Sequence, residues 1–263
     1  MLIEQIWIDN PWRNFNYLVA CPETGEALAI DPLDSQRCLQ VASTQGWQIK
    51  QVLNTHEHFD HIQGNADLIE ATGAVLLAHH NAADKIPHID IPLQANSLVK
   101  VGRSVAFRVL DTPGHTMSHI CLFSDAQTPV LFSGDTLFNA GAGNCHNGGH
   151  PRELYETFSE QLTALPDTTR LYPGHDYIVN NLRFTLDREP SNQKAAELLS
   201  QVQNQDPNCA LVTTLGLEKQ VNCFFRLDNP DIIENLKLVV PEFPKNPDPQ
   251  TVFLALRELR NKW

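Results

Sequence analysis

The chain has 263 residues, of which 42% are apolar and 19% charged, and its formal net charge is −12 at pH 7. This composition is that of an ordinary globular protein with a sizeable core, and it excludes collagen-like, coiled-coil and disordered chains. A surface with this much negative charge repels phosphate backbones, and we therefore expect no nucleic-acid partner. No apolar run reaches the roughly 20 residues of a membrane span, and the first residues lack a signal-peptide pattern. We therefore expect no membrane association and a cytoplasmic location.

Short apolar runs alternate with helical patterns along the first two-thirds of the chain. The runs typical of strands cover residues 16–21, 26–30, 49–54, 74–78, 105–110, 120–123, 130–132 and 170–172. Helical spacing of apolar residues covers 36–45, 62–72 and 154–164. Alternating strands and helices predict a layered α/β domain.

The pattern changes near residue 176. Residues 177–189 and 192–205 show helical spacing, with Pro190 between them where a helix would end. A proline-rich connection then leads to a last helical pattern over 249–262. We predict one domain over 1–175 and a smaller, mainly helical domain over 176–263.

The densest cluster of metal-binding side chains lies at 55–61, which reads Thr-His-Glu-His-Phe-Asp-His between a strand-like run and a helical pattern. Imidazole nitrogen and carboxylate oxygen are ligands of divalent transition metals. In an extended segment side chains alternate, so His56 and His58 would share a face and chelate one ion, and Asp60 would continue that face. His61 would enter the helix, face elsewhere and reach a second ion.

Three further candidate ligands share one context. His115, Asp135 and His175 each follow an apolar strand-like run, and each is preceded by glycine. Glycine allows a sharp turn and a close approach of the backbone to a ligand. Ligands at strand ends converge on one rim of a sheet, where active sites of α/β proteins commonly lie.

The motifs THEHFDH, GHT, GDT and GHD, in this order, resemble the metallo-β-lactamase superfamily. The resemblance implies a four-layer αβ/βα sandwich with the site at one edge. It also implies two metal ions, one held by three histidines, the other by two histidines and an aspartate, with a further aspartate as bridge. The implied ligands are His56, His58 and His115 for the first ion, Asp60, His61 and His175 for the second, and Asp135 between them.

Several segments are similar to the glyoxalase II (hydroxyacylglutathione hydrolase) family within that superfamily. They are Gly-Asp-Thr-Leu-Phe at 134–138, Gly-His-Asp-Tyr at 174–177, Asn-Asn-Leu-Arg-Phe at 180–184 and the stretch from Thr-Thr-Leu to Asn-Cys-Phe-Phe-Arg over 213–226. The resemblance implies hydrolysis of S-lactoylglutathione to glutathione and D-lactate, as in methylglyoxal detoxification. It also implies that residues 1–175 form the catalytic domain, that residues 176–263 bind substrate, and that two divalent metals are bound. Ligands of this kind accept zinc, iron or manganese, of which we expect zinc. We also expect a monomer.

The family's glutathione pocket suggests four substrate-binding residues here. Tyr177 and Arg226 match the family pattern. Asn144 stands where the family has lysine, and His146 where it has tyrosine. A charge-assisted hydrogen bond from lysine contributes about 1.5 to 3 kcal/mol, so its loss would weaken glutathione binding roughly tenfold to a hundredfold. A thioester of another thiol therefore stays open as the substrate.

The hypothesis for the mechanism is a hydroxide that bridges the two metals, attacks the thioester carbonyl and is oriented by Asp60. Thiolate is a good leaving group, so no strong general acid is needed. Three alternatives remain open at this point: a mono-iron persulfide dioxygenase, a metal-dependent phosphodiesterase or nuclease, and a metal-stabilised binding module without turnover. Metal content together with oxygen uptake or thioester hydrolysis would distinguish them.

Overall fold

The computed structural model describes residues 1–263. The first sheet contains β1 (Leu2–Trp7), β2 (Phe15–Ala20), β3 (Glu26–Ile30), β4 (Gln48–Leu53), β5 (Val75–His79) and β6 (Ile91–Leu93). The second contains β7 (Leu98–Val101), β8 (Val105–Asp111), β9 (Ile120–Ser124), β10 (Val130–Gly134) and β13 (Arg170–Pro173), and a separate hairpin contains β11 (Leu137–Phe138) and β12 (Gly141–Ala142). The α-helices are α1 (Ser35–Gln45), α2 (Phe59–Ile62), α3 (Asn65–Thr72), α4 (Pro151–Glu156), α5 (Ile178–Arg188), α6 (Gln193–Val202), α7 (Leu215–Val221), α8 (Pro230–Val239) and α9 (Pro249–Asn261). The shorter turns are η1 (His80–Ala82), the π-helical η2 (Thr157–Leu162), η3 (Pro207–Cys209) and η4 (Cys223–Phe225).

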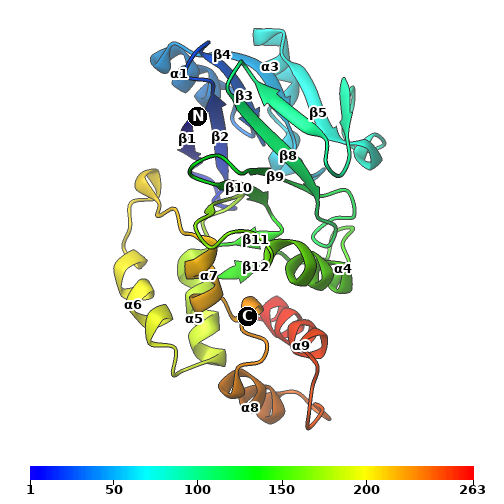
Figure 1. Cartoon of the computed structure of the whole chain (residues 1–263), viewed down its shortest axis with the longest axis vertical. Helices are drawn as coiled ribbons and strands as arrows, with labels where there is room; N and C mark the ends of the chain where they lie inside the picture. The colour runs from blue at the N-terminus through cyan, green and yellow to red at the C-terminus, as the bar shows by residue number, and fades with distance from the viewer.

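The first sheet has the strand order β1-β2-β3-β4-β5-β6 and is covered by helices on one face (Figure 1). Side chains of successive residues in β2 point to opposite sides of the sheet, so the two faces of this strand pack against different neighbours. Leu18 and Ala20 pack in one cluster with residues of α1 and α3, whereas Tyr17 and Val19 pack toward the second sheet. Every residue of β2 is buried, which is why the run reads as continuously apolar.

The second sheet, ordered β13-β10-β9-β8-β7, faces the first across one apolar core. Aromatic rings fill the space between the sheets: Phe132 stacks on Tyr172 at 5.0 Å and meets Phe107 edge-on at 5.8 Å. The two sheets with helices on their outer faces form the four-layer αβ/βα sandwich, so the sequence-based fold is confirmed.

The C-terminal helices pack on the outer face of the second sheet. In one cluster, Leu131 of β10 and Leu154 of α4 are buried with Phe224 of η4 and Phe253 of α9. In Figure 1 these helices occupy the lower half of the molecule, next to β11, β12 and α4. The residues before and after 175 therefore share a core, and division into two domains at 175 stays a prediction.

Each strand-like run of the sequence overlaps an observed strand, with ends that agree to within two residues, and the helical patterns differ from the structure at two places. The predicted helix 62–72 is broken, because a Cβ at Gly64 would lie 2.0 Å from the carbonyl oxygen of Pro32 and the chain must pass closely there. The predicted helix 154–164 is divided between α4 and η2. The strands β1, β6, β7, β11 and β12 and the helices α7 and α8 were not predicted.

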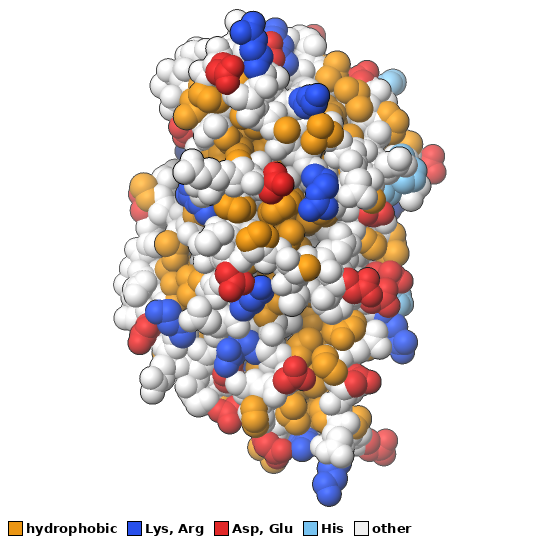
Figure 2. Space-filling model, in the orientation of Figure 1, with side chains coloured by type: hydrophobic (Ala, Val, Ile, Leu, Met, Phe, Trp, Pro, Cys, Tyr) orange, Lys and Arg blue, Asp and Glu red, His pale blue; other side chains and the backbone are white.

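None of the helices combines the length and apolar character needed to cross a membrane. On the face shown in Figure 2, Lys and Arg side chains lie singly among Asp and Glu side chains, and apolar side chains are exposed between them. That face carries no continuous field of one sign.

Candidate metal centre

The seven ligand candidates of the sequence converge at one edge of the sandwich. They come from the segment after β4, from the loop after β8 and from the ends of β10 and β13. Parallel pairing of β10 with β13 brings Gly134 opposite Pro173, so the residues that follow these two strands emerge side by side.

The first group of ligand atoms consists of three imidazole nitrogens. His58 Nδ1 lies 3.0 Å from His56 Nε2 and 2.9 Å from His115 Nε2. The ring planes of these histidines are close to perpendicular, at 83° to 85°. Three nitrogens at such distances are arranged as ligands of one cation.

The second group combines two imidazoles and a carboxylate. His61 Nε2 lies 3.2 Å from His175 Nε2, and Asp60 Oδ2 is 3.6 Å and 3.5 Å from these two nitrogens. Asp135 lies between the groups: its Oδ1 is 3.4 Å from His61 Nε2, and its Oδ2 is 3.5 Å from His115 Nε2 and 3.1 Å from His175 Nε2.

The backbone of this segment differs from the extended conformation expected from the sequence. Helix α2 begins at Phe59, directly after His58, so Asp60 and His61 belong to one helical turn. The expectation that Asp60 continues the face of His56 and His58 is therefore wrong. A helical turn instead places neighbouring residues about 100° apart, which lets Asp60 and His61 approach His175 together.

The hydrogen bonds around the five histidines fix their tautomers. In each ring one nitrogen faces the cluster, and the other faces a group that accepts a hydrogen bond, so a proton is held on the outer nitrogen and the inner nitrogen is the one directed at a cation. The outer partners are Thr55 Oγ1 for His56 (3.0 Å), Asn147 O for His58 (3.0 Å), Asp31 Oδ2 for His61 (3.0 Å), Asn144 O for His115 (2.7 Å) and Trp12 O for His175 (2.7 Å).

Asp31 forms hydrogen bonds with Thr55 and His61, and the sequence analysis did not identify it. Its Oδ1 accepts a hydrogen bond from the Thr55 backbone at 2.7 Å, and its Oδ2 accepts from the Thr55 hydroxyl at 2.7 Å as well as from His61. Both oxygens of Asp31 are thus engaged by Thr55 and His61, and its carboxylate also lies within ligand distance of His56 and His61. Its position after the apolar run 26–30 is one part of the signal that identified Asp135, but Ile30 precedes it where Asp135 has a glycine.

Two glycines make room for the ligands. A Cβ at Gly174 would lie 2.2 Å from Asp135 Oδ1 and 2.9 Å from His61 Cε1. Gly134 has φ +45° and faces the Thr55 hydroxyl, where a Cβ would lie at 2.5 Å. Any larger residue would displace the ligand groups themselves.

Burial and charge prepare the cluster for cations. Burial lowers the pKa of His115 to about 4, and it lowers the pKa of His56 well below its usual value, with His61 and His115 adding to the effect. These imidazoles are thus neutral, the form that binds metal. Asp135 Oδ1 is buried and accepts no hydrogen bond. Inward lone pairs together with an unpartnered carboxylate oxygen fit divalent cations.

Glu57 ties the two histidine-bearing loops together. Its buried carboxylate accepts hydrogen bonds from Thr116 Oγ1 at 2.9 Å and Ser118 Oγ at 2.7 Å, and it pairs with Lys85 Nζ at 2.5 Å. Burial opposes ionisation of Glu57, but Lys85, Ser118 and Thr116 outweigh it and lower its pKa to about 2. The segment of His58 is thereby connected to the loop of His115.

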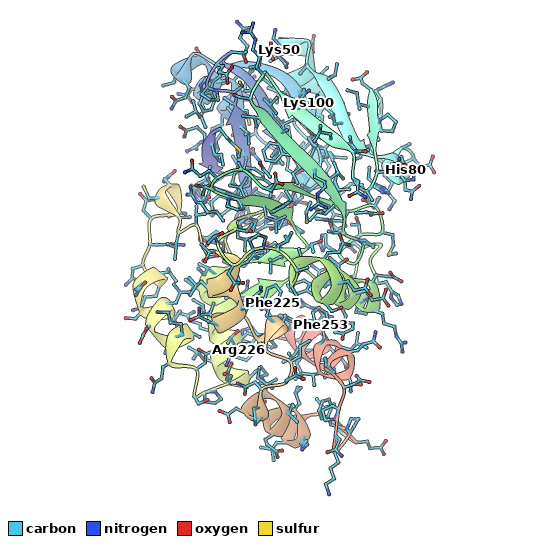
Figure 3. All side chains as sticks on the ribbon, viewed as in Figure 1. Lys50, His80, Lys100, Phe225, Arg226 and Phe253 are labelled. Atoms are coloured by element: carbon cyan, nitrogen blue, oxygen red, sulfur yellow. The ribbon has the colours of Figure 1, made fainter.

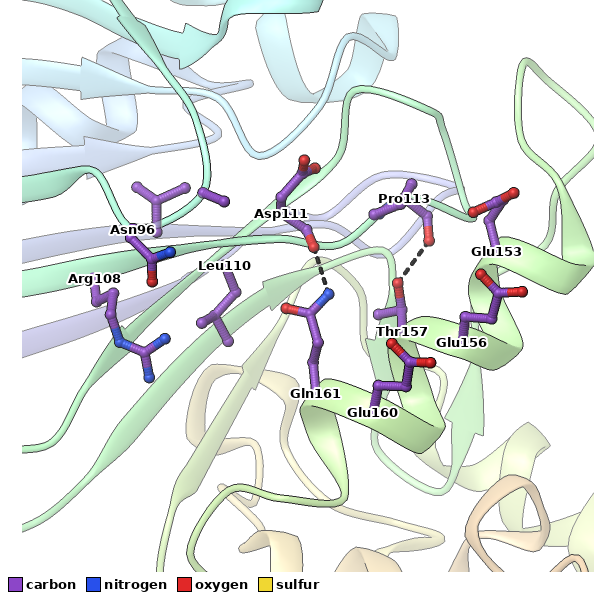
Figure 4. Close-up of a pocket in the computed structure, with 12 residues that line it drawn as sticks. Asn96, Arg108, Leu110, Asp111, Pro113, Glu153, Glu156, Thr157, Glu160 and Gln161 are labelled. Carbon is purple, nitrogen blue, oxygen red and sulfur yellow. Dashed lines mark hydrogen bonds between the residues drawn. The ribbon is translucent and has the colours of Figure 1, made fainter.

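The turn η2 holds the start of the His115 loop (Figure 4). Thr157 Oγ1 donates to the carbonyl of Pro113 at 2.8 Å, and Gln161 Nε2 donates to the carbonyl of Asp111 at 2.6 Å. The cavity beside these contacts, about 410 Å³, is lined by the carboxylates of Glu153, Glu156 and Glu160. Its negative lining disfavours an anionic substrate, and it contains none of the metal ligands.

The metal cluster opens into a cavity of about 460 Å³. Asn144 and Tyr177, both predicted from the sequence as substrate contacts, line it together with the exposed rings of Trp12 and Phe59. Tyr177 stacks on His175 with a ring separation of 4.9 Å. Burial raises the pKa of the Tyr177 phenol well above its usual range, so the hydroxyl remains a hydrogen-bond donor.

The other two predicted substrate contacts lie elsewhere. His146 lines a neighbouring cavity of about 410 Å³ with Arg152 and Arg257. Arg226 is in the helical half, in the region of Phe225 and Phe253 (Figure 3), and lines neither cavity. Its Nε and Nη2 donate to Glu189 at 2.7 Å and 2.6 Å, which leaves the guanidinium little capacity for a substrate.

Two arginines of α9 near the cavities were not identified from the sequence. The buried Arg257 donates through Nη1 to the carbonyls of Ala142 and Gly143, and its guanidinium reaches the cavity of His146. Arg260 donates to Asn181 and is close enough to Tyr177 to affect its pKa. The sequence signal that could have identified Arg257 is a cationic side chain on the buried face of an amphipathic helix, next to Phe253 and Leu256.

Comparison with known proteins agrees with this geometry. The model of the metallo-beta-lactamase superfamily matches residues 11–175, and that of the hydroxyacylglutathione hydrolase C-terminus matches 176–263. A hydroxyacylglutathione hydrolase of Nitrosococcus oceani is 64% identical over 263 residues, covering 100% of both chains. The chain belongs to the hydroxyacylglutathione hydrolase family. As a member of this family it is a divalent-metal enzyme.

Solved structures extend the similarity beyond the family. A crystal structure of ETHE1 from Myxococcus xanthus has a TM-score of 0.68 and 26% identity, covering 99% of this chain and 98% of that one. A structure of TTHA1623 in a di-iron-bound form has a TM-score of 0.59 and 26% identity, covering 84% and 98%. Both have the fold that, in this chain, places the candidate ligands at one edge.

Proposed function

We propose that the chain hydrolyses S-2-hydroxyacyl glutathione, S-lactoylglutathione foremost, to glutathione and a 2-hydroxy acid such as D-lactate. The observation that carries this proposal is the convergence of five histidines with inward-facing nitrogens and two carboxylates on one cavity. Full-length similarity to hydroxyacylglutathione hydrolases supports the choice of a thioester as substrate.

The proposed metal ligands divide into two sets that share one carboxylate. The three-imidazole set and the set of two imidazoles and one carboxylate each suit a divalent transition metal. We propose zinc for both, with iron or manganese as alternatives, and the di-iron form of a structure of similar fold keeps iron open. The proposed ligands are His56, His58 and His115 for one ion, Asp60, His61 and His175 for the other, and Asp135 for both.

Two bound cations would lower the pKa of water and stabilise negative charge on the thioester oxygen. The side chains of the chain then orient the reactants. Asn14 Nδ2 donates to Asp60 Oδ2 at 3.0 Å, which leaves Asp60 Oδ1 to accept a hydrogen bond from the attacking water and direct its lone pair to the carbonyl carbon. A thiolate leaves without a strong general acid, so the pocket needs no further proton donor.

The polar side of the cavity is the proposed place of the thiol. Asn144 and Tyr177 offer an amide and a phenol there, and the next residues along the loop lead to His146 and Arg257 in the neighbouring cavity. Cationic and neutral hydrogen-bond donors suit the carboxylates of glutathione. Because Asn144 and His146 are weaker anchors than permanently charged groups, a different acidic thiol is the alternative.

A thioester panel with metal analysis tests the proposal. We expect fast hydrolysis of S-lactoylglutathione, slower hydrolysis of lactoyl esters of coenzyme A and of cysteamine, and about two divalent ions per chain. If thioesters of another acidic thiol are hydrolysed faster, the proposed reaction stands and the proposed substrate is replaced. Failure to hydrolyse any thioester with the metal sites filled would refute the proposed function.

A further inference from the structure

Phe59 separates the metal cavity from a second, apolar cleft. The Phe59 ring is 63% exposed, lines the metal cavity, and also lines a cleft of about 540 Å³ on the far side. Its chain neighbours His58 and Asp60 both belong to the metal cluster. The cleft therefore begins within one residue of the proposed metal ligands.

The walls of the cleft are mainly apolar, and two of their polar side chains are bonded elsewhere; Gln63 and His88 also line the cleft. Ile62, Ala66 and Ile69 come from α2 and α3, opposite Leu76 and Pro87, and these form the apolar part of the lining. Among the polar members, Asp90 Oδ2 accepts from the Leu76 backbone at 2.8 Å, and the Asn65 amide exchanges hydrogen bonds with that of Asn54 at 2.7 Å and 3.1 Å. Apolar burial is therefore the main interaction that this cleft offers an occupant.

The two sides of the metal cavity thus differ in chemistry. One side carries Asn144 and Tyr177 and leads toward Arg257, whereas the other ends at Phe59 and the apolar cleft. A thioester whose carbonyl lies at the metals extends in two directions, with a polar thiol on one side and an acyl group on the other. The polar side matches the thiol, so the acyl group is directed to the cleft.

On this basis, and resting on the proposed function, we propose that the cleft beyond Phe59 is an acyl-binding site for 2-hydroxyacyl thioesters with aliphatic chains longer than lactoyl. The three-carbon lactoyl group remains at the metals, whereas a longer chain passes over the Phe59 ring and reaches Ile62 and Ile69. Each methylene moved from water to an apolar wall contributes about fourfold to binding. Three additional methylenes therefore favour the longer substrate by roughly sixtyfold when fully buried, and by about tenfold when they are about half buried in the open cleft.

The test compares S-lactoylglutathione with S-2-hydroxyhexanoylglutathione in the metal-loaded enzyme. We expect kcat/KM for the six-carbon substrate to exceed that of lactoylglutathione by about tenfold, mainly through a lower KM. Ala66→Trp fills the cleft from an exposed position of α3 and should bring the ratio of the two kcat/KM values close to one. Ala71→Trp, the same substitution at an exposed position of α3 that does not line the cleft, should leave the ratio unchanged.

The outcomes separate this proposal from the proposed function. Hydrolysis of lactoylglutathione without a preference for the longer chain, or a preference that Ala66→Trp leaves intact, overturns the acyl site alone. Absence of hydrolysis of both substrates overturns the proposed function and the acyl site with it. Should Ala66→Trp fail to fold by circular dichroism, Ile69→Gln introduces a polar group into the cleft without added bulk and must lower the same ratio.

Discussion

Asp60 is the more accessible of the two carboxylates in the metal cluster. Its side chain is 20% exposed, whereas that of Asp135 is 8% exposed and lies between both ligand groups. Asn14 holds one oxygen of Asp60 through its side-chain amide. Asp60 is thus placed both to bind metal and to meet water that enters the cavity.

Replacing Asp60 by asparagine should leave the fold intact and remove the negative charge at this point. We expect turnover of lactoylglutathione to fall by roughly a hundredfold or more, since an amide neither accepts a water proton nor balances a cation equally well. Metal content should fall below two ions per chain. Asp67→Asn, at an exposed position of α3, is the control, and near-normal turnover of Asp60→Asn would contradict the assigned role.

We predict that Arg226 stabilises the folded protein and does not bind substrate. Its partner Glu189 is 2% exposed, so Arg226→Ala leaves a buried carboxylate without its charged partner, at a cost of about 3 to 5 kcal/mol. We expect a lower urea midpoint in unfolding experiments and an unchanged KM for lactoylglutathione. An increased KM with undiminished stability would instead support the substrate contact expected from the sequence.

The candidate ligands could be identified from sequence because they form a dense cluster of His and Asp after one strand or lie within a few residues of the ends of others. Asp31 carries part of the same signal, but without the fold nothing distinguishes a ligand from a residue that orients one. Arg257 has no such signal: it is buried in a helix more than a hundred residues from the carbonyls it binds. Contacts of that range depend on tertiary packing, which local patterns do not contain.

At the scale of elements, the loop between β8 and β9 depends on how closely α4 approaches it. Gly114 has φ +145°, and a Cβ there would lie 2.4 Å from Leu154 Cα and 2.6 Å from Leu154 N. The obstacle is helix backbone, which cannot rotate away as a side chain can. The position of His115 therefore requires glycine at the preceding residue.

Gly114→Ala should displace this loop and weaken the first metal site. Backbone strain alone contributes about 1 to 3 kcal/mol of destabilisation, and the clash with α4 adds to it. We expect a lower thermal midpoint and reduced zinc affinity, measured by competition with a chelator. Gly46→Ala, at a helix end with φ +69° and open space around it, is the control for strain without a clash, and it should retain normal metal affinity.

Apart from the helices α7 and α8, the elements that sequence patterns did not reveal are short or lie at the edges of sheets. Strand β6 has three residues and contains Pro92, which pattern analysis counts against a strand, although edge strands tolerate proline. Helix α2 has four residues, too few for an amphipathic period. By contrast, the buried central strands and the amphipathic α5, α6 and α9 were predictable, because their burial extends over several periods.

At the scale of the whole molecule, the helical C-terminal part and the sandwich are joined by buried polar contacts as well as by a common core. Glu218 of α7 is fully buried, and its Oε2 accepts from the backbone of Ala140 at 2.7 Å, between β11 and β12. Its Oε1 accepts from Thr213 Oγ1 at 2.6 Å. The hairpin below the metal cavity is thus held by a carboxyl from the C-terminal part.

This carboxyl should make stability depend on pH. Burial raises the pKa of Glu218 from 4.5 to about 7, against the opposing effect of hydrogen bonds from Thr213, Ala140 and Asn222. Because the pKa is higher in the folded state, its contribution to stability is full below pH 4.5 and is lost as pH rises to 7. The loss is on the order of 3 kcal/mol, at about 1.4 kcal/mol per pH unit.

Comparison of the wild-type chain with Glu218→Gln isolates this effect, because the histidines titrate in both proteins and cancel in the difference. Glutamine stays neutral, so the free energy of unfolding of the variant should improve relative to wild type between pH 4.5 and pH 7, and the difference should be constant above pH 7. Urea unfolding at several pH values measures it. The exposed Glu234→Gln should give a flat difference. If the difference in free energy of unfolding between Glu218→Gln and wild type is also independent of pH, Glu218 is ionised in the folded protein. Its three hydrogen-bond donors would then stabilise the carboxylate despite complete burial.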